Sequence, residues 1–335
     1  MISIVLPVYN AEEYVRKCIT AIQAQTYENW ELVIIDNAST DTSLEICKEA
    51  AREDSRIQVF HQYKNKGVSG ARNLGLERSS GEFITFIDAD DWVKPDYLEV
   101  LLRTQKKYHA DMVVCGYEKV QNREGVQMDT EKYEITGKVY SKIEYFRDYL
   151  LEGNTHCWGA LFCTKKIESI RFPHKITIGE DLLYLIHAAQ NMDTIAVSKY
   201  QGYEYFMNPQ GAMLKRFTHE YMDQLVCWQQ AREELTKEFP ELENKINSII
   251  VVSSLLVVGK IAELSRREQE ACNEDLNECL KVVREYGALR EVRRLLPAGY
   301  PLKVFIFRRA PKLYIKLYGM KKSTEQRTRI RQQAT

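Results

Sequence analysis

Residues 83–100 have the sequence FITFIDADDWVKPDYLEV, in which an apolar run leads directly into Asp88, Asp90 and Asp91. The apolar run is typical of a buried strand. Pro95 suits the first position of the helix that we expect to follow. Carboxylates this close repel one another, so the cluster needs a cation or several hydrogen-bond donors to be stable. The segment therefore predicts a strand, an acidic turn with partners elsewhere in the chain, and a helix.

The same alternation of strand and helix runs through the first 120 residues. Four further apolar segments are predicted strands: residues 2–8, 30–36, 56–62 and 110–120. The first two intervening helices have predicted N-caps at Asn10 and Thr42, with Glu45 at capping-box spacing from Thr42. Alternation of this kind predicts a three-layer α/β fold with a mostly parallel sheet.

The pattern changes in the second half of the chain. Mixed strands and short helices are expected up to about residue 215, and almost continuous helix beyond Phe217. We therefore expect an α/β domain over residues 1–215, a helical domain over 216–296 and a basic amphipathic tail over 297–335. The apolar run at 249–258 is only ten residues long, too short for a bilayer core of ~30 Å, so a buried helix is expected there.

Charge is distributed unevenly along these 335 residues. Residues 290–335 contain 13 Lys and Arg against two Glu, a local net charge of +11, while the whole chain is neutral. Such a tail predicts an anionic partner. The eight cysteines form no C-x-x-C pair and indicate reduced, structural thiols, and the chain begins directly as a strand without a basic signal region. We expect a cytoplasmic protein.

Acidic and polar residues follow several predicted strands, where ligands bind to parallel sheets. The segment PVYN, residues 7–10, comes at the end of the first strand, Asp36 ends the second and the acidic turn follows the fourth. Converging carboxylates suit a divalent cation that carries a diphosphate. The alternative is a solvated turn that caps the next helix. The first β–α turn, PVYNAEEY, has no glycine, so the G-x-G-x-x-G motif of dinucleotide-binding enzymes is missing there.

Five segments together resemble the family 2 glycosyltransferases, which are inverting enzymes with the GT-A fold. They are SIVLPVYNAEEYVRKCI, IDNASTDTS, NKGVSGARNLGLERSSGEFITFIDADDWV, WGALF and GEDLLY, and they occur in the usual order within residues 1–215. The resemblance implies transfer of a sugar from a UDP-sugar to a hydroxyl of a glycan or lipid-linked acceptor. Surface polysaccharide synthesis, as in capsule, exopolysaccharide or cell wall, is the implied pathway.

The resemblance also implies a donor site. Asp36 would accept a hydrogen bond from the uracil, and Asp88 would bind the ribose or support the metal. Asp90 would coordinate Mn²⁺ or Mg²⁺, and Asp91 would be a second ligand, a helix cap or a support, of which we favour the last two. The remaining implied donor-site residues are Pro7, Val8 and Tyr9 beside the nucleotide, Asn65 and Arg72 at the base or its loop, and Trp158 near the sugar.

Inversion in a single displacement needs a base for the acceptor hydroxyl. The resemblance places this base at Asp181, with Glu180 orienting the acceptor. Acids in the first turn of a helix are also common as caps, which remains the alternative from the residues alone. In the segment YEYFMNPQGAMLKRF, which resembles a lid over the diphosphate, Gly211 stands where serine is common. Lys215 or Arg216 would then supply the positive charge.

The basic tail interleaves cations with aromatic and aliphatic residues, for example in PLKVFIFRRAPKLYIKLYGMKK at 301–322. This pattern favours the surface of an anionic membrane, so we expect peripheral binding at its inner face; a solvated helical face is the alternative. No nucleic-acid module accompanies the tail, and no nucleic acid is expected as a partner. Three rival functions remain: a sugar-1-phosphate nucleotidylyltransferase, a catalytically inactive nucleotide-binding or scaffolding protein, and a basic-tailed nucleic-acid binder that would be indifferent to UDP.

Overall fold

The computed structural model describes residues 1–121, 135–208 and 216–320. The chain divides into two compact units, Met1–Gly211 and Ala212–Thr335. The boundary predicted at residue 215 lies outside the described residues. The first unit contains the sheet and the second is helical.

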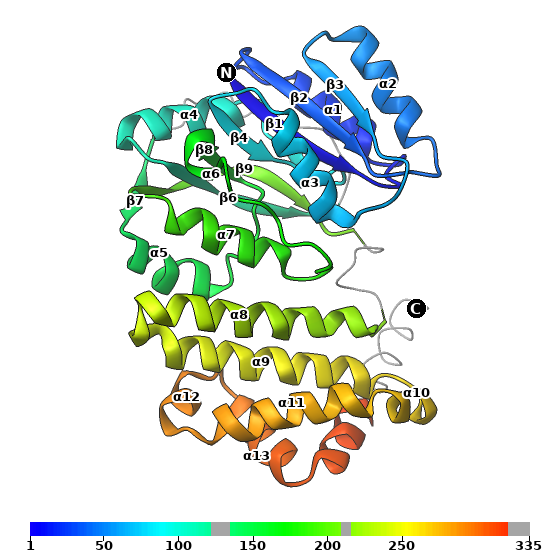
Figure 1. Cartoon of the computed structure of the whole chain (residues 1–335), viewed down its shortest axis with the longest axis vertical. Coiled ribbons are helices and arrows are strands. Elements are labelled where there is room, and N and C mark those ends of the chain that lie inside the picture. The colour runs from blue at the N-terminus through cyan, green and yellow to red at the C-terminus, as the bar shows by residue number, and fades with distance from the viewer. Residues whose placement is uncertain (122–134, 209–215, 321–335) are drawn as a thin grey trace, which may run out of the picture. The chain divides into compact units, whose positions relative to one another are not determined.

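The first unit is built on a single nine-stranded sheet in the order β3-β2-β1-β4-β8-β6-β9-β5, with β7 paired to β9 (Figure 1). Its strands β1 to β4 are mutually parallel, and β6 and β9 are parallel to each other. β8 lies antiparallel between β4 and β6. The prediction of a mostly parallel α/β sheet is confirmed. The strands are β1 (Ile2–Val8), β2 (Trp30–Asp36), β3 (Ile57–His61), β4 (Phe83–Phe86), β5 (Trp92–Val93), β6 (Met112–Val120), β7 (Gly137–Tyr140), β8 (Ala160–Cys163) and β9 (Ile195–Phe206).

Helices cover both faces of this sheet (Figure 1). On one face, Ile4 of β1 shares a buried cluster with Ile19 of α1 and Leu98 of α4. On the other face, Ala71 of α3 packs on β2, and the ring of Tyr184 in α7 lies 5.6 Å from Phe86 of β4. The predicted three layers are therefore present. The helices of this unit are α1 (Val15–Gln23), α2 (Ser43–Glu53), α3 (Gly67–Arg78), α4 (Tyr97–Tyr108), α5 (Lys142–Asp148), α6 (Thr164–Ile167) and α7 (Glu180–Gln190).

Strand register brings the predicted site segments to one edge of the sheet. Val8 at the end of β1 is opposite Asp36 at the end of β2, and Val5 is opposite Phe86 of β4. The acidic turn follows Phe86 by two residues, so it emerges at the same edge. Helix α3 lies directly on β1, because a Cβ at Gly75 would be only 2.3 Å from Val5 Cγ1. This close approach positions the preceding turn of α3, which contains Arg72.

Two of the predicted helix starts, at Asn10 and Pro95, are wrong in detail, and the start predicted at Thr42 is confirmed without its capping box. Helix α1 begins at Val15, because Asn10 adopts a left-handed conformation, φ 47°, and accepts a hydrogen bond from the main-chain N–H of Thr40 at 2.8 Å. Thr42 is the N-cap of α2 but forms no capping box, since its hydroxyl donates to Glu12 at 2.7 Å. Helix α4 begins at Tyr97 with Asp96 as N-cap, so Pro95 lies just before the cap.

The second unit is an assembly of helices around α9, which contacts α8, α11, α12 and α13. Their bounds are α8 (Asp223–Glu238), α9 (Glu243–Ala262), α10 (Arg266–Ala271), α11 (Asn273–Glu285), α12 (Arg290–Leu295) and α13 (Tyr300–Arg309), and residues 311–320 are also helical. Val304 and Phe307 of α13 are buried, so this part of the predicted tail belongs to a packed core.

One segment among the described residues, Pro240–Ala262, is long and apolar enough to cross a membrane when judged by length and composition alone. It has 23 residues, its most apolar 18-residue window has a mean hydropathy of 1.7, and 72% of that window is buried inside the structure. Our expectation that this helix would be too short was wrong, because the helix extends on both sides of the ten-residue apolar run. The prediction that it is buried is confirmed.

Candidate active site

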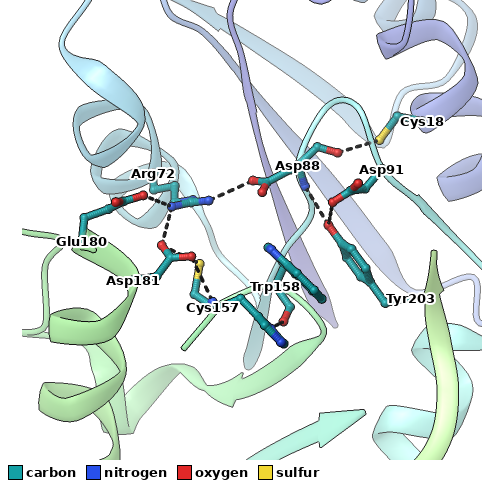
Figure 2. A network of polar contacts seen from close by, with 10 residues as sticks. Cys18, Arg72, Asp88, Asp91, Cys157, Trp158, Glu180, Asp181 and Tyr203 are labelled. Atoms are coloured by element: carbon teal, nitrogen blue, oxygen red, sulfur yellow. Dashed lines mark hydrogen bonds and ion pairs between the residues drawn. The ribbon is translucent and has the colours of Figure 1, made fainter. Parts of the chain in front are cut away.

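Arg72 joins the acidic turn to the start of α7 (Figure 2). Its side chain is only 3% exposed and its guanidinium contacts three carboxylates. One terminal nitrogen donates to Asp88 at 2.9 Å, and the other donates to Asp181 at 2.6 Å and to Glu180 at 3.2 Å. The structure thus brings together four predicted site residues, two of which are separated from Arg72 by more than 100 positions in the sequence.

Asp181 is held by donors on both carboxylate oxygens. Besides Arg72, it accepts a hydrogen bond from the main-chain N–H of Cys157 at 3.2 Å, and the Cys157 thiol donates at 3.4 Å. The helix that carries Asp181 has Gly179 as its N-cap, and the φ of 99° at this position favours glycine. The positive end of the helix dipole and these donors stabilise the carboxylate in one orientation. Cys157 has no signature that would have identified it from sequence.

The site has more negative charge than Arg72 offsets. Burial, followed by the charge of Asp181, raises the pKa of Glu180 to about 7, although Arg72 acts in the opposite direction. Burial also raises the pKa of Asp88, and the charges of Asp181 and Asp90 add to that effect. A further cation or a ligand with hydrogen-bond donors would relieve this repulsion.

Asp91 ties the acidic turn to β9. It is 1% exposed and accepts hydrogen bonds from the Tyr203 hydroxyl at 2.7 Å and from the main-chain N–H of Phe206 at 2.8 Å. The Tyr203 oxygen in turn accepts from the main-chain N–H of Asp88 at 3.2 Å (Figure 2). Asp91 is therefore not the cap of α4, which is Asp96. The alternative of a solvated turn is also wrong, because this carboxylate is buried.

Asp88 and Asp90 each retain a carboxylate oxygen that makes no hydrogen bond to a described residue. The other oxygen of Asp88 accepts from Arg72, and that of Asp90 accepts from Asn208 at 3.0 Å. Within the described residues no group of three His, Cys, Asp or Glu side chains could hold a metal by itself. Two carboxylate oxygens nevertheless fit Mg²⁺ or Mn²⁺ that takes its remaining ligands from substrate phosphates and water.

Asp36 lies fully buried at the end of β2, with His61 beside it. Its Oδ2 is 2.7 Å from His61 Nδ1 and accepts from the main-chain N–H of Ser39 at 3.3 Å. Its Oδ1 has no hydrogen-bond partner among the described residues. Sequence reasoning missed His61, although it ends the predicted third strand and lies directly opposite Asp36 in the sheet. The rule that residues at the carboxyl ends of parallel strands line the ligand-binding edge, which was applied to Asp36, would also have identified His61.

The other predicted nucleotide-side residues lie around this edge. Val8 is buried, and its carbonyl accepts from the main-chain N–H of Asn37 at 2.8 Å. Tyr9, the next residue after Pro7 and Val8, is 50% exposed. Asn65 accepts hydrogen bonds from the Asn37 side chain at 3.0 Å and from the Gly67 N–H at 2.8 Å, which steadies the loop before α3.

Trp158 belongs to a stack of aromatic rings beside Asp181. Its ring centroid is 3.6 Å from that of His156, 4.4 Å from that of Tyr203 and 5.4 Å from that of Tyr205, with nearly parallel planes. Burial lowers the pKa of His156, which favours its neutral form in this stack.

The stacked tyrosines come from the predicted lid segment. Within that segment, Gly211 and Lys215 lie outside the described residues, and Arg216 pairs with Glu268 at 3.3 Å.

Comparison with known proteins places these features in a family. The family model described as "Glycosyl transferase family 2" matches residues 3–171, half of the chain. The chain belongs to glycosyl transferase family 2. The resemblance inferred from sequence is therefore confirmed, and the matched segment contains Asp36, Arg72, Asp88 and Asp90.

Two named relatives are similar to part of the chain. It is 39% identical over 191 residues to "Glycosyltransferase GlyA" of Streptococcus pneumoniae serotype 4 (strain ATCC BAA-334 / TIGR4), which covers 54% of this chain and 27% of GlyA. It is 33% identical over 117 residues to "Putative teichuronic acid biosynthesis glycosyltransferase TuaG" of Bacillus subtilis (strain 168), covering 35% of this chain and 46% of TuaG. The chain thus matches less than half of the length of either relative.

A solved structure resembles almost the whole chain. The structure of S. aureus TarS 1–349 in complex with UDP-GlcNAc matches with a TM-score of 0.69 and 19% sequence identity, covering 97% of this chain and 92% of that one. At this level of identity the likeness shows the fold, and it confirms the predicted GT-A architecture with a helical C-terminal part.

Proposed function

We propose that this protein is an inverting, metal-dependent glycosyltransferase that moves a sugar from a UDP-sugar to a hydroxyl of a glycan or lipid-linked acceptor. The observation that carries the proposal is the contact of Arg72 with both the acidic turn and Asp181. It places the candidate donor residues and the candidate base in one connected cluster. The family supports the reaction class, and the UDP-GlcNAc bound to TarS supports a uridine nucleotide.

The donor would bind along the carboxyl edge of the sheet. The Oδ1 of buried Asp36, which has no hydrogen-bond partner among the described residues, suits the imide N–H of uracil. Each of these two polar groups would be costly to bury without such a partner. The neighbouring residues Pro7, Val8 and Tyr9 would border the base, with Asn65 holding the adjoining loop. Trp158, fixed by its ring stack, would lie beside the transferred sugar.

Asp181 would act as the base. As the acceptor oxygen forms its bond to the anomeric carbon, the bond from that carbon to the diphosphate breaks, and the hydroxyl proton passes to the Asp181 carboxylate. The donors from Arg72 and Cys157 hold this carboxylate in place for the transfer. Glu180, whose pKa is raised to about 7, is suited to donate a hydrogen bond to the acceptor while it is protonated.

Asp90, with Asp88 beside it, would hold Mn²⁺ or Mg²⁺. A divalent ion bound there would offset the surplus carboxylate charge and stabilise the negative charge that develops on the departing UDP. Arg72 would keep the Asp88 carboxylate aligned by donating to one of its oxygens. The second oxygen would then remain for the metal.

Calorimetric titration of UDP with and without Mn²⁺ tests the donor site. Wild-type protein should bind UDP more tightly with Mn²⁺, and Asp90→Ala should lose the metal-dependent gain. Asp193→Ala is a matched control, since the Asp193 side chain is 82% exposed and pairs with Lys166, away from the acidic turn in sequence and contacts. Absence of UDP binding by wild-type protein under both conditions would overturn the uridine assignment.

A screen of UDP-sugars with release of UDP as the readout tests transfer. Asp181→Asn should reduce turnover by about 10²–10⁴-fold, the usual range for a lost general base, while UDP binding remains. UDP binding without turnover for any donor and acceptor would instead favour the inactive nucleotide-binding or scaffolding protein.

The cellular setting is part of the same proposal. TuaG is named for teichuronic acid biosynthesis, which supports a role in surface polysaccharide synthesis. A lipid-linked acceptor would place the enzyme at the cytoplasmic face of the membrane. Vesicle flotation of the full chain and of a variant truncated after residue 320, which retains the buried residues of α13, tests this placement, and equal binding by both would contradict a role for the end of the basic tail.

A further inference from the structure

The second unit contains a cavity surrounded by arginines. Its volume is about 630 Å³, and it lies where α11, α12 and α13 meet. Its lining residues are Arg284, Arg293, Pro301, Val304, Phe305, Arg308 and Arg309. Four of these seven side chains are cationic and none is acidic.

The fold brings these arginines together through close helix packing. A Cβ at Gly287 would lie 2.9 Å from Val304 Cγ1 and 3.9 Å from Arg308 Cδ, so glycine permits the turn after α11 to approach α13. Val304 and Phe307 are buried on the inner face of α13. Arg308 and Arg309 follow them at the end of this helix, beside the cavity.

The arginines lack compensating carboxylates in the described part of the chain. None of the four forms an ion pair with a described residue, and the buried Nε of Arg308 has no hydrogen-bond partner there. Arg293 donates to the Ala288 carbonyl at 2.6 Å, and the Arg309 guanidinium lies 4.6 Å from the Phe305 ring centroid. A buried guanidinium donor without an acceptor is costly, so an external anion would stabilise this arrangement.

The chemistry of the cavity matches a phosphoryl group. Guanidinium groups present planar pairs of donors that fit phosphate oxygens, and several of them around one cavity can share the anionic charge. The surrounding surface adds a second property. Leu302 and Phe305 on the same helix are 64% and 53% exposed, and Leu295 at the end of α12 is 48% exposed. Cations beside exposed apolar side chains suit the interface of an anionic bilayer.

We propose that this arginine pocket binds the phosphoryl group of a membrane lipid headgroup. The apolar side chains next to it would then face the acyl boundary of the same membrane. The site differs from a general basic tail, because it requires Arg284 and Arg293 from α11 and α12 as well as the arginines of α13.

Matched pairs of variants of the full chain can separate a pocket from general positive charge. The pocket variant is Arg284→Gln with Arg309→Gln. The control is Arg290→Gln with Arg294→Gln, which removes the same charge from exposed positions on α12 that do not line the cavity. Arg308→Lys is a third variant, which keeps the charge but removes the planar donor pair.

Two probes distinguish the sources of the phosphoryl group. Flotation with vesicles of phosphatidylglycerol and phosphatidylcholine measures lipid binding, with pure phosphatidylcholine vesicles as the neutral reference. Calorimetry with inorganic pyrophosphate measures binding of a soluble phosphate. We expect the pocket variant to bind anionic vesicles at least about tenfold more weakly than the control, with Arg308→Lys also weakened.

Three results would overturn the proposal. Equal losses in the pocket variant and the control would mean that charge alone attracts the protein to the vesicles. Binding of pyrophosphate, but not of vesicles, would overturn the lipid source, as would tighter binding of a twelve-nucleotide oligouridine than of anionic vesicles. Sugar transfer is not measured in any of these assays, so their outcome is independent of the proposed enzymatic function.

Discussion

The two units of the chain place arginine in opposite settings. Arg72 in the first unit is 3% exposed and contacts three carboxylates. In the second unit, four arginines surround a cavity that no acidic side chain lines. The first setting leaves surplus negative charge and suits a cation with its ligand, whereas the second leaves surplus positive charge and suits an anion. The neutral net charge of the whole chain conceals both, which shows that function depends on where the charges are compensated.

The largest effect on stability is expected from Arg72→Gln, which removes the cation that compensates the three carboxylates of the first unit. It leaves three carboxylates close together without their cation, and loss of one partner from a buried ion pair costs about 3–5 kcal/mol. Urea unfolding followed by tryptophan fluorescence in a Trp228→Phe background reports the first unit alone, since the other three tryptophans lie there. Arg103→Gln, at an exposed position on α4, is the control, and equal midpoints for the two variants would refute the compensation by Arg72.

Tyr203→Phe is expected to destabilise the first unit by about 1–3 kcal/mol, the usual cost of leaving a buried polar group unsatisfied. The variant removes the hydroxyl that donates to buried Asp91 and accepts from the Asp88 main chain. Tyr205→Phe is a close control. Tyr205 stacks on Trp158, as Tyr203 does, but its hydroxyl has no hydrogen bond to a described residue. The same fluorescence assay measures both variants, and a larger loss for Tyr205→Phe would contradict the assigned role.

Glu180→Gln should change how stability depends on pH. The pKa of Glu180 is about 7 in the folded protein against an ordinary value of 4.5, so the folded state retains a proton that the unfolded chain releases between these values. The stability that this bound proton contributes to the folded state is therefore fully present below pH 4.5 and is lost as pH rises to about 7. The change in the free energy of unfolding is up to about 1.4 kcal/mol per pKa unit.

Unfolding free energies at pH 5, 6, 7 and 8 test this sign. Glu180→Gln should lose stability less steeply than wild-type protein over this range and should be the more stable of the two at pH 8. Glu77→Gln, at an exposed position on α3, should follow the wild-type slope. Parallel curves for Glu180→Gln and wild-type protein would show that the burial of Glu180 carries no such cost.

The smallest effect on stability is expected from Arg309→Gln in the uncompensated setting. Removal of one of four like charges should change the free energy of unfolding by less than about 0.5 kcal/mol, in the direction of greater stability. Thermal unfolding at 20 and 500 mM NaCl checks this, since any gain at low salt should disappear when salt screens the repulsion. A clear loss of stability at both salt concentrations would mean that the contact of Arg309 with the Phe305 ring outweighs the repulsion among the arginines.

Several features of the site were predictable because they are local or follow from the period of the sheet. Apolar runs predicted the strands, and parallel strands bring their carboxyl ends to one edge, which placed Asp36 and Asp88 correctly. His61 was equally accessible to this rule. The helix starts were less predictable. Asn10 has the side chain of an N-cap, but its side-chain Oδ1 accepts a hydrogen bond from the main-chain N–H of Thr40, 30 residues away, instead of capping a helix.

By itself, the sequence determined the α/β class, the acidic edge of the sheet and the family, since these follow from periodicity and from motifs of contiguous residues. Only the tertiary structure decided which charges meet. Arg72 contacts acids 16, 108 and 109 positions away, and the arginine pocket combines residues on both sides of the domain boundary expected at 296. Such contacts depend on the packing of whole helices, on approaches such as that of Gly75 to Val5, and on side-chain directions that no local pattern contains.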